Sequence, residues 1–283
     1  MTVVAAVLVA AVLLAGCAAS GPSPAPPAPP AAFRITPEHA PDSLDAVLER
    51  RFTTWNFRLE SGRVLPELTL VFETYGRLVP DGRNAILITH GFSSSHRAAG
   101  RRAGDRAPGW WNELIGPGKP FDTERYFVVS SNMLGSSYGS TAPRSIDPAT
   151  GRPYGPDFPD ITLHDIVTAQ RALLDALGVR RLVAVAGPSF GGYQAFQWAV
   201  SYPDFVLGIV PVLTAPWGAR GPTAEAMMRR FAADPNWNGG WHYDRGGIVE
   251  TLTQRRIGTL RAYGAEALLA RRGHDAAGRE ARL

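Results

Sequence analysis

One serine, Ser189, lies in the sequence Gly187-Pro188-Ser189-Phe190-Gly191, between an apolar β-branched run and a segment with helical periodicity. A G-x-S-x-G turn that joins a strand to a helix holds its serine in a strained conformation and lifts the hydroxyl above the sheet edge. The helix that follows directs its first N–H groups toward the same point, where they favour a developing oxyanion. We therefore predict that Ser189 is a nucleophile; the alternative is a tight turn without chemistry.

An oxyanion hole needs two N–H donors close to the nucleophile. The backbone N–H of Phe190 is the first expected donor, because it directly follows Ser189. The second should come from the loop after an earlier strand. This loop contains His90-Gly91-Phe92, so the backbone N–H of Phe92 is the expected donor. We expect His90 to pack or hydrogen-bond beneath this loop, and His96 to be solvated.

The elements that must position these residues alternate between strands and helices. Residues 85–89, "AILIT", form a short continuous apolar run that suits a central parallel strand. Residues 160–178 have the periodicity of an amphipathic helix, and Ser189 opens another helix that extends to Val200. The remaining strands are expected at 126–130, 182–186 and 207–213. This alternation predicts a doubly wound, mostly parallel sheet. The helical sequence pattern from Trp217 onward predicts a cap.

Long stretches of the predicted loop sequence resemble those of a known family. The run that begins "GWWNELIGPGKPFDTERYFVVSSNMLGSSYGSTAPRSIDP" at Gly109, and "GPSFGGYQAFQWAVSYPD" around Ser189, resemble the homoserine O-acetyltransferase branch of the α/β hydrolases. The resemblance extends from about Phe52 to about Arg272 and implies the α/β-hydrolase fold. It also implies an acyl-enzyme on Ser189 and acyl transfer from a thioester to a small hydroxyl acceptor, or to water in hydrolytic relatives. The implied partner is therefore a small-molecule acyl ester or thioester, with acyl-CoA as a co-substrate and no bound cofactor.

A serine nucleophile needs a histidine base and an orienting carboxylate, which follow the serine in this fold. Only His242 and His274 follow Ser189. His242 lies in a Gly/Asn-rich turn and is expected to be a surface or loop-packing histidine; no apolar strand precedes His274. His164 begins a helix and is expected to face solvent or cap the turn. The triad Asp and His are thus not identified, and the chain reads as lacking the C-terminal strands.

Two accounts of the missing base remain open. The chain is truncated at Leu283, or it is complete and catalytically inactive. In the second account the protein is a lipid-anchored envelope protein that uses the hydrolase fold as a binding module.

The first seventeen residues are apolar and too short to span a membrane as a mature helix. Their end, Leu14-Ala15-Gly16-Cys17, resembles a bacterial lipobox, in which Cys17 becomes lipidated; the alternative is a plain signal peptide or a misassigned start. We expect an exported bacterial lipoprotein anchored in the cell envelope. The predicted organisation is a signal peptide at 1–16, the lipidated cysteine and a Pro/Ala-rich tether at 17–32, a core at 33–216 and a helical cap region at 217–283.

The composition excludes other classes of protein. The chain has 29 basic and 25 acidic residues among its 283, mostly interspersed, so no basic footprint for nucleic acid is expected. Cys17 is the only cysteine, which rules out a disulfide within the chain. The histidines are scattered, so no metal site is predicted. The oligomeric state is left open.

Overall fold

The computed structural model describes residues 32–37, 44–217 and 224–282. The predicted signal peptide, Cys17 and nearly all of the tether lie outside these residues, so export and lipid attachment stay predictions. Within the described residues, no helix is long and apolar enough to cross a membrane.

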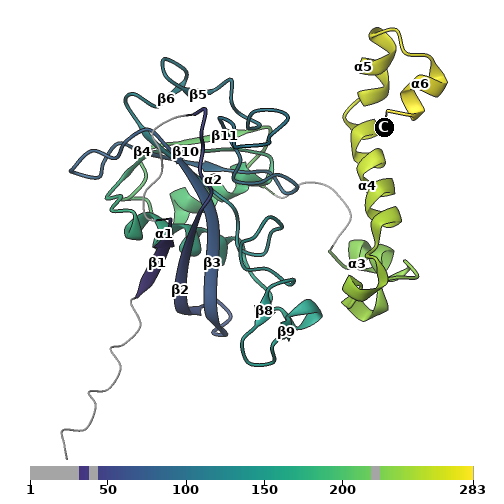
Figure 1. Ribbon diagram of the computed structural model, residues 1–283, viewed down its shortest axis with the longest axis horizontal. Coiled ribbons are helices and arrows are strands. Elements are labelled where there is room, and N and C mark those ends of the chain that lie inside the picture. Colours follow the sequence, from purple (N-terminus) through teal and green to yellow (C-terminus); the bar gives the residue numbers. More distant parts are fainter. Residues whose placement is uncertain (1–31, 38–43, 218–223, 283) are drawn as a thin grey trace, which may run out of the picture. The chain divides into compact units, whose positions relative to one another are not determined.

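Seven strands form the central sheet in the order β1-β2-β3-β7-β4-β10-β11 (Figure 1). The strands are β1 (Phe33–Thr36), β2 (Arg50–Arg58), β3 (Val64–Tyr75), β4 (Ala85–Thr89), β7 (Phe127–Ser131), β10 (Leu182–Pro188) and β11 (Ile209–Val212). β7, β4, β10 and β11 are parallel to one another, and β1 to β3 extend the sheet as an antiparallel ribbon. The predicted strands at 85–89, 126–130, 182–186 and 207–213 are confirmed within a few residues, and so is the α/β fold class.

The sheet is buried on both faces, because successive side chains of a strand point to opposite sides. On one face Leu87 and Val129 belong to a core that also contains Leu173 of α1 (Leu163–Ala176) and Trp198 of α2 (Phe190–Ser201). On the other face Ile86, Ile88 and Val128 pack with residues of the long connection between β4 and β7, which includes β5 (Ile115–Gly116) and β6 (Phe121–Asp122). Two helices therefore cover one face and a loop-rich segment covers the other.

Local signals in the sequence set the bounds of α1. The Thr162 side chain accepts from the backbone N–H of Asp165, and the Asp165 carboxylate accepts from the backbone N–H of Thr162, a capping box. Gly178, with a φ of 83°, follows the last turn, where a left-handed residue ends the helix. These caps fix the helix against which α2 packs.

The chain after β11 is helical in the described residues, with no strand among them. The remaining elements are β8 (Ile146–Asp147), β9 (Arg152–Pro153), the 3₁₀ turns Gly155–Asp157, Asn238–Gly240 and Tyr243–Arg245, and helices α3 (Ala224–Ala232), α4 (Val249–Ala262), α5 (Ala265–Arg271) and α6 (Ala276–Glu280). The helical character predicted from Trp217 onward is confirmed. The division into core and cap stays a prediction.

Candidate active site

Ser189 lies at the turn between β10 and α2, where its backbone adopts φ 51° and ψ −117°. This conformation is strained for any residue other than glycine. Three backbone hydrogen bonds hold the turn in place. Ser189 N donates to Val212 O at 2.8 Å, and Ser189 O accepts from Gly192 N at 2.9 Å and from Tyr193 N at 3.3 Å. The side chain is exposed, so the strained turn presents the hydroxyl to solvent above the sheet.

The two glycines of the motif are required because the turn packs against the end of β4. A Cβ at Gly187 would lie 2.3 Å from the carbonyl oxygen of Thr89, and one at Gly191 would lie 2.2 Å from the same atom. The buried Thr89 hydroxyl donates to the Gly191 carbonyl at 2.9 Å. Thr89 therefore holds the turn in place by close packing and by a hydrogen bond. This role of Thr89 is not predicted from the sequence, although a polar side chain at the end of an apolar strand is a local signal for it.

We expect Gly191→Ala to destabilise the protein by about 1 to 3 kcal/mol, the usual cost of overpacking. The added methyl would meet the backbone of Thr89, which cannot move without disturbing the sheet. Gly258→Ala is the matched control, because Gly258 lies within α4 and an added Cβ would meet no atom within 4 Å beyond its own helix backbone. Alanine there should raise the free energy of unfolding by roughly 0.5 to 1 kcal/mol. Urea unfolding of both variants measures the difference, and equal effects would contradict the packing argument.

The two predicted oxyanion donors belong to neighbouring segments. A Cβ at Gly91 would lie 3.9 Å from the Cβ of Ser189, so the peptide between Gly91 and Phe92 borders the nucleophile. The rings of Phe92 and Phe190 form an edge-to-face pair with centroids 5.9 Å apart. As the first residue of α2, Phe190 has an N–H without an intrahelical acceptor. The arrangement allows both N–H groups to serve one oxyanion, and that role stays a prediction.

His90 lies beneath the oxyanion loop, as expected from the sequence. Its side chain is fully buried, with Nδ1 2.8 Å from Gly91 O and Nε2 3.2 Å from Met133 N. Burial lowers the pKa of His90, so the ring is neutral near neutral pH. It therefore occupies a structural position under the loop.

The expectation that His96 is solvated is wrong. Only 1% of His96 is exposed, and its Nε2 lies 3.2 Å from Glu49 Oε2 and 2.7 Å from Arg102 Nη2. Burial, together with the charge of Arg102, lowers the pKa of His96 to about 4. The polar sequence around His96 suggests solvent exposure, but one of its partners, Glu49, lies 47 residues away in the sequence.

The other histidine candidates stand apart from the nucleophile. His242 stacks on Trp237 and lines a cleft of about 500 Å³ whose described lining does not include Ser189. His164 Nδ1 lies 3.3 Å from the Ser201 hydroxyl in an exposed position, and His274 directly precedes the N-cap of α6. Within the described chain, no histidine hydrogen-bonds to Ser189. The packing expected for His242 is confirmed, and the base of Ser189 is not among these contacts.

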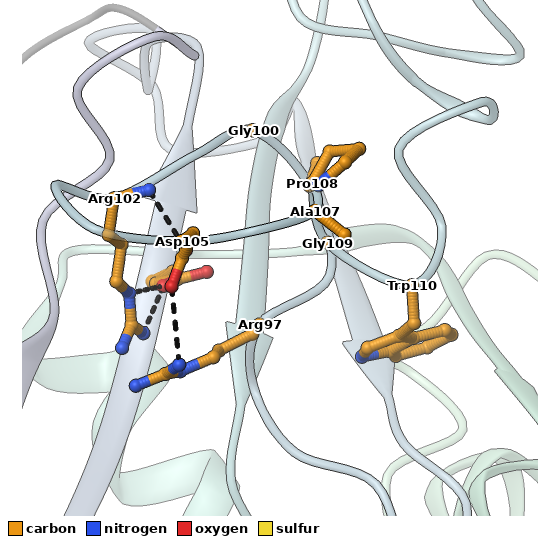
Figure 2. Close-up of a pocket in the computed structure, with 10 residues that line it drawn as sticks. Arg97, Gly100, Arg102, Asp105, Ala107, Pro108, Gly109 and Trp110 are labelled. Carbon is orange, nitrogen blue, oxygen red and sulfur yellow. Dashed lines mark hydrogen bonds and ion pairs between the residues drawn. The ribbon is translucent and has the colours of Figure 1, made fainter.

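A buried ionic cluster holds the loop that follows the oxyanion segment. Arg102 donates to Glu73 Oε1 through Nε at 2.6 Å and to Glu49 Oε2 through Nη1 at 2.8 Å. The Tyr75 hydroxyl donates to Glu73 at 2.5 Å, and burial raises the pKa of Glu73. Figure 2 shows Asp105 of the same loop beside a cavity of about 110 Å³. The Asp105 carboxylate accepts from the backbone N–H of Arg102 at 3.0 Å and pairs with Arg97 Nη1 at 3.5 Å. Charge pairing, rather than regular structure, thus fixes this loop.

Arg255 is a candidate site residue that the sequence analysis missed. Its guanidinium lies 6.0 Å from the centroid of the Phe92 ring and 5.8 Å from that of Phe231. A helix from the region after β11 thereby brings a cation to the oxyanion loop. Nothing local distinguishes Arg255 from its neighbour Arg256, so only the tertiary structure could identify it. In the same described residues, no group of three or more histidine, cysteine or acidic side chains is arranged to hold a metal ion.

The comparisons with known proteins agree with this geometry. Residues 84–261 match the family of the α/β hydrolase fold. A homoserine O-acetyltransferase of Moorella thermoacetica is 48% identical over 76% of this chain and 59% of its own length. A homoserine O-succinyltransferase of Alkalilimnicola ehrlichii is 43% identical over 81% of this chain and 60% of its own length. The crystal structure of esterase E22 superposes with a TM-score of 0.68 at 39% identity, over 73% of this chain and 58% of that one.

The chain belongs to the α/β hydrolase fold family. Within it, the chain falls in the homoserine O-acetyltransferase-like branch, as the resemblance in the sequence indicated. It spans about three-fifths of the length of these two curated relatives.

Proposed function

We propose that this protein performs acyl transfer through an acyl-enzyme on Ser189. The observation that carries the proposal is the strained, exposed Ser189 at the first turn of α2, with Gly91 of the oxyanion loop alongside it. Strain of this kind persists only where the surrounding structure enforces it, and it clusters at active sites. The named activities of the relatives, homoserine O-acetyl- and O-succinyltransferase, support the same reaction class.

The proposed reaction has two steps. The Ser189 oxygen attacks the carbonyl carbon of an acyl thioester, the carbon–sulfur bond breaks, and the thiol leaves with the serine proton. The hydroxyl of a small acceptor then attacks the acyl-enzyme, which gives an ester and regenerates the serine hydroxyl. In both steps the oxyanion accepts hydrogen bonds from the Phe92 and Phe190 N–H groups, which stabilises the transition state. The group that relays the proton is not assigned.

Ester hydrolysis is the second candidate, with water in place of the hydroxyl acceptor in the second step. Two observations favour it: Ser189 is exposed to solvent, and esterase E22 superposes on most of this chain. The two candidates share the acyl-enzyme and differ only in what attacks it.

The deciding experiment supplies acetyl-CoA with and without L-homoserine, measures the free thiol released, and identifies the products by mass spectrometry. O-acetylhomoserine that forms with wild-type protein and not with Ser189→Ala supports transfer. Thiol release that yields only acetate, at a rate independent of homoserine, supports hydrolysis. A wild-type protein that releases no thiol and carries no acetyl group on Ser189 would refute both.

Arg255 is expected to bind a carboxylate on the acceptor, because it brings a positive charge to the edge of the site. Arg255→Met should raise the KM for homoserine about 10- to 100-fold, which corresponds to the loss of one hydrogen bond between charged groups. Hydrolysis of the neutral ester p-nitrophenyl acetate should change much less. Arg256→Met, at an exposed neighbouring position, is the matched control. Equal KM values in the two variants would contradict the assignment.

A further inference from the structure

Two hydrogen bonds to backbone groups fix the tautomer of the His90 ring, which also contacts the Asn132 side chain. Met133 N–H can only donate, so His90 Nε2 must accept from it at 3.2 Å. The Gly91 carbonyl can only accept, so Nδ1 must carry the proton and donate to it at 2.8 Å. The ring is therefore neutral, with its hydrogen on Nδ1. Ser94 N–H donates to the same carbonyl at 3.0 Å, so two donors hold the Gly91 oxygen.

The direction of this carbonyl sets the direction of the predicted oxyanion donor. In a trans peptide the C=O of one residue and the N–H of the next point in opposite directions. Because the Gly91 carbonyl points at the His90 ring, the Phe92 N–H of the same peptide points away from that ring. This peptide borders Ser189, since a Cβ on Gly91 would lie 3.9 Å from the Ser189 Cβ. We infer that His90 is a positioning residue, which aims the Phe92 N–H at the oxyanion by holding the Gly91 carbonyl from beneath.

A chain of buried hydrogen bonds keeps His90 itself in place. The Gln194 amide donates to the His90 carbonyl at 3.2 Å and accepts from Gln170 Nε2 at 2.8 Å. Gln170 in turn accepts from the indole N–H of Trp198 at 2.8 Å. All four side chains are fully buried, and the Gln194 bond holds the backbone of His90. A rotation of the ring would leave the Met133 N–H without its acceptor. Helices α1 and α2 thus support the oxyanion loop through His90.

Two isosteric variants separate positioning from packing. The amide nitrogen of His90→Asn can take the place of Nδ1 and donate to Gly91, whereas the amide oxygen of His90→Gln can take the place of Nε2 and accept from Met133. The inference rests on the proposed nucleophile, so the readout is the second-order rate constant for labelling of Ser189 by a fluorophosphonate. We expect His90→Gln to slow labelling about 10- to 100-fold, somewhat less than the loss of a whole oxyanion donor. His90→Asn should retain most of the rate.

The outcomes are distinguishable from a failure of the proposed function. Wild-type protein that is not labelled at Ser189 would refute the nucleophile, whatever His90 does. Labelled wild-type protein with folded Asn and Gln variants that react alike would overturn the positioning role and leave His90 as packing. Thermal unfolding of each variant verifies the fold.

A measurement on the wild-type protein tests the same inference if the Gln variant does not fold. Nitrogen-15 NMR of the histidine rings, with the His90 signals identified by their absence in His90→Asn, reports which nitrogen carries the proton. The inference requires a protonated Nδ1 and an unprotonated Nε2 at neutral pH. A protonated Nε2 would mean that the ring does not donate to Gly91, which would overturn it.

Discussion

Ser189→Ala is expected to abolish covalent labelling by a fluorophosphonate, a loss of more than about 10⁴-fold, while leaving the protein folded. The substitution removes the only atom that attacks the phosphorus. The serine side chain caps no N–H group of α2, so its loss leaves no buried polar group unpaired. Labelling that persists in the alanine variant, located by peptide mass spectrometry at another residue, would refute the assignment of the nucleophile.

A glycine at the same position tests whether the backbone strain belongs to the active site. Glycine adopts a positive φ at no steric cost, whereas serine and alanine at a φ of 51° do not. Ser189→Gly should therefore lose labelling as completely as Ser189→Ala but gain about 1 to 3 kcal/mol in its free energy of unfolding, which is the usual size of such strain. Urea unfolding of the two variants gives the difference. If both have the same stability, the turn is not strained and the structural argument for a nucleophile weakens.

The parts of the site that the sequence predicted are those encoded by contiguous residues. The run 85–89 is apolar throughout and becomes β4, all five residues of it buried. Gly187 and Gly191 flank Ser189 closely in sequence, and together with the preceding strand, the following helix and the upstream His90-Gly91 they identify the turn. The capping residues of α1 are likewise local. Periodicity and turn chemistry act over a few residues, so a sequence displays them directly.

The parts that the sequence did not predict depend on contacts between distant residues. His96 stands in a polar stretch, yet it is buried because Glu49 and Arg102 reach it from positions 47 and 6 residues away. Arg255 reaches the ring of Phe92 from a helix far along the chain. The loop that contains Arg102 has no periodicity, because charge pairs and scattered apolar contacts hold it rather than one regular apolar face. Such pairs have no local signature.

Arg102→Met is expected to cost about 3 to 5 kcal/mol in the free energy of unfolding, the range for breaking a buried ion pair from one side. The side chains of Arg102 and Glu73 are only 13% and 1% exposed, so solvent cannot replace the lost partner of Glu73. Arg101→Met is the matched control at an exposed neighbouring position, and it should change stability by less than about 0.5 kcal/mol. Urea unfolding at neutral pH measures both. Similar effects of the two substitutions would mean that the cluster does not stabilise the loop.

The stability that Arg102→Met loses should depend on pH, because the substitution leaves the buried Glu73 carboxylate without its ion-pair partner. Burial raises the pKa of Glu73 and the charge of Arg102 opposes that rise, so the variant should have a still higher Glu73 pKa when folded. When the pKa of a carboxyl is higher in the folded than in the unfolded state, the free energy of unfolding falls as the pH rises through the folded pKa. The deficit should therefore be larger above neutral pH than under mildly acidic conditions. Adding Glu73→Gln, which keeps an acceptor for the Tyr75 hydroxyl but carries no charge, should recover part of the stability and reduce this pH dependence. The remainder comes from Glu49 and His96, because the charge of Arg102 lowers the pKa of each. A deficit that is independent of pH would instead assign the loss to the packing of the arginine side chain.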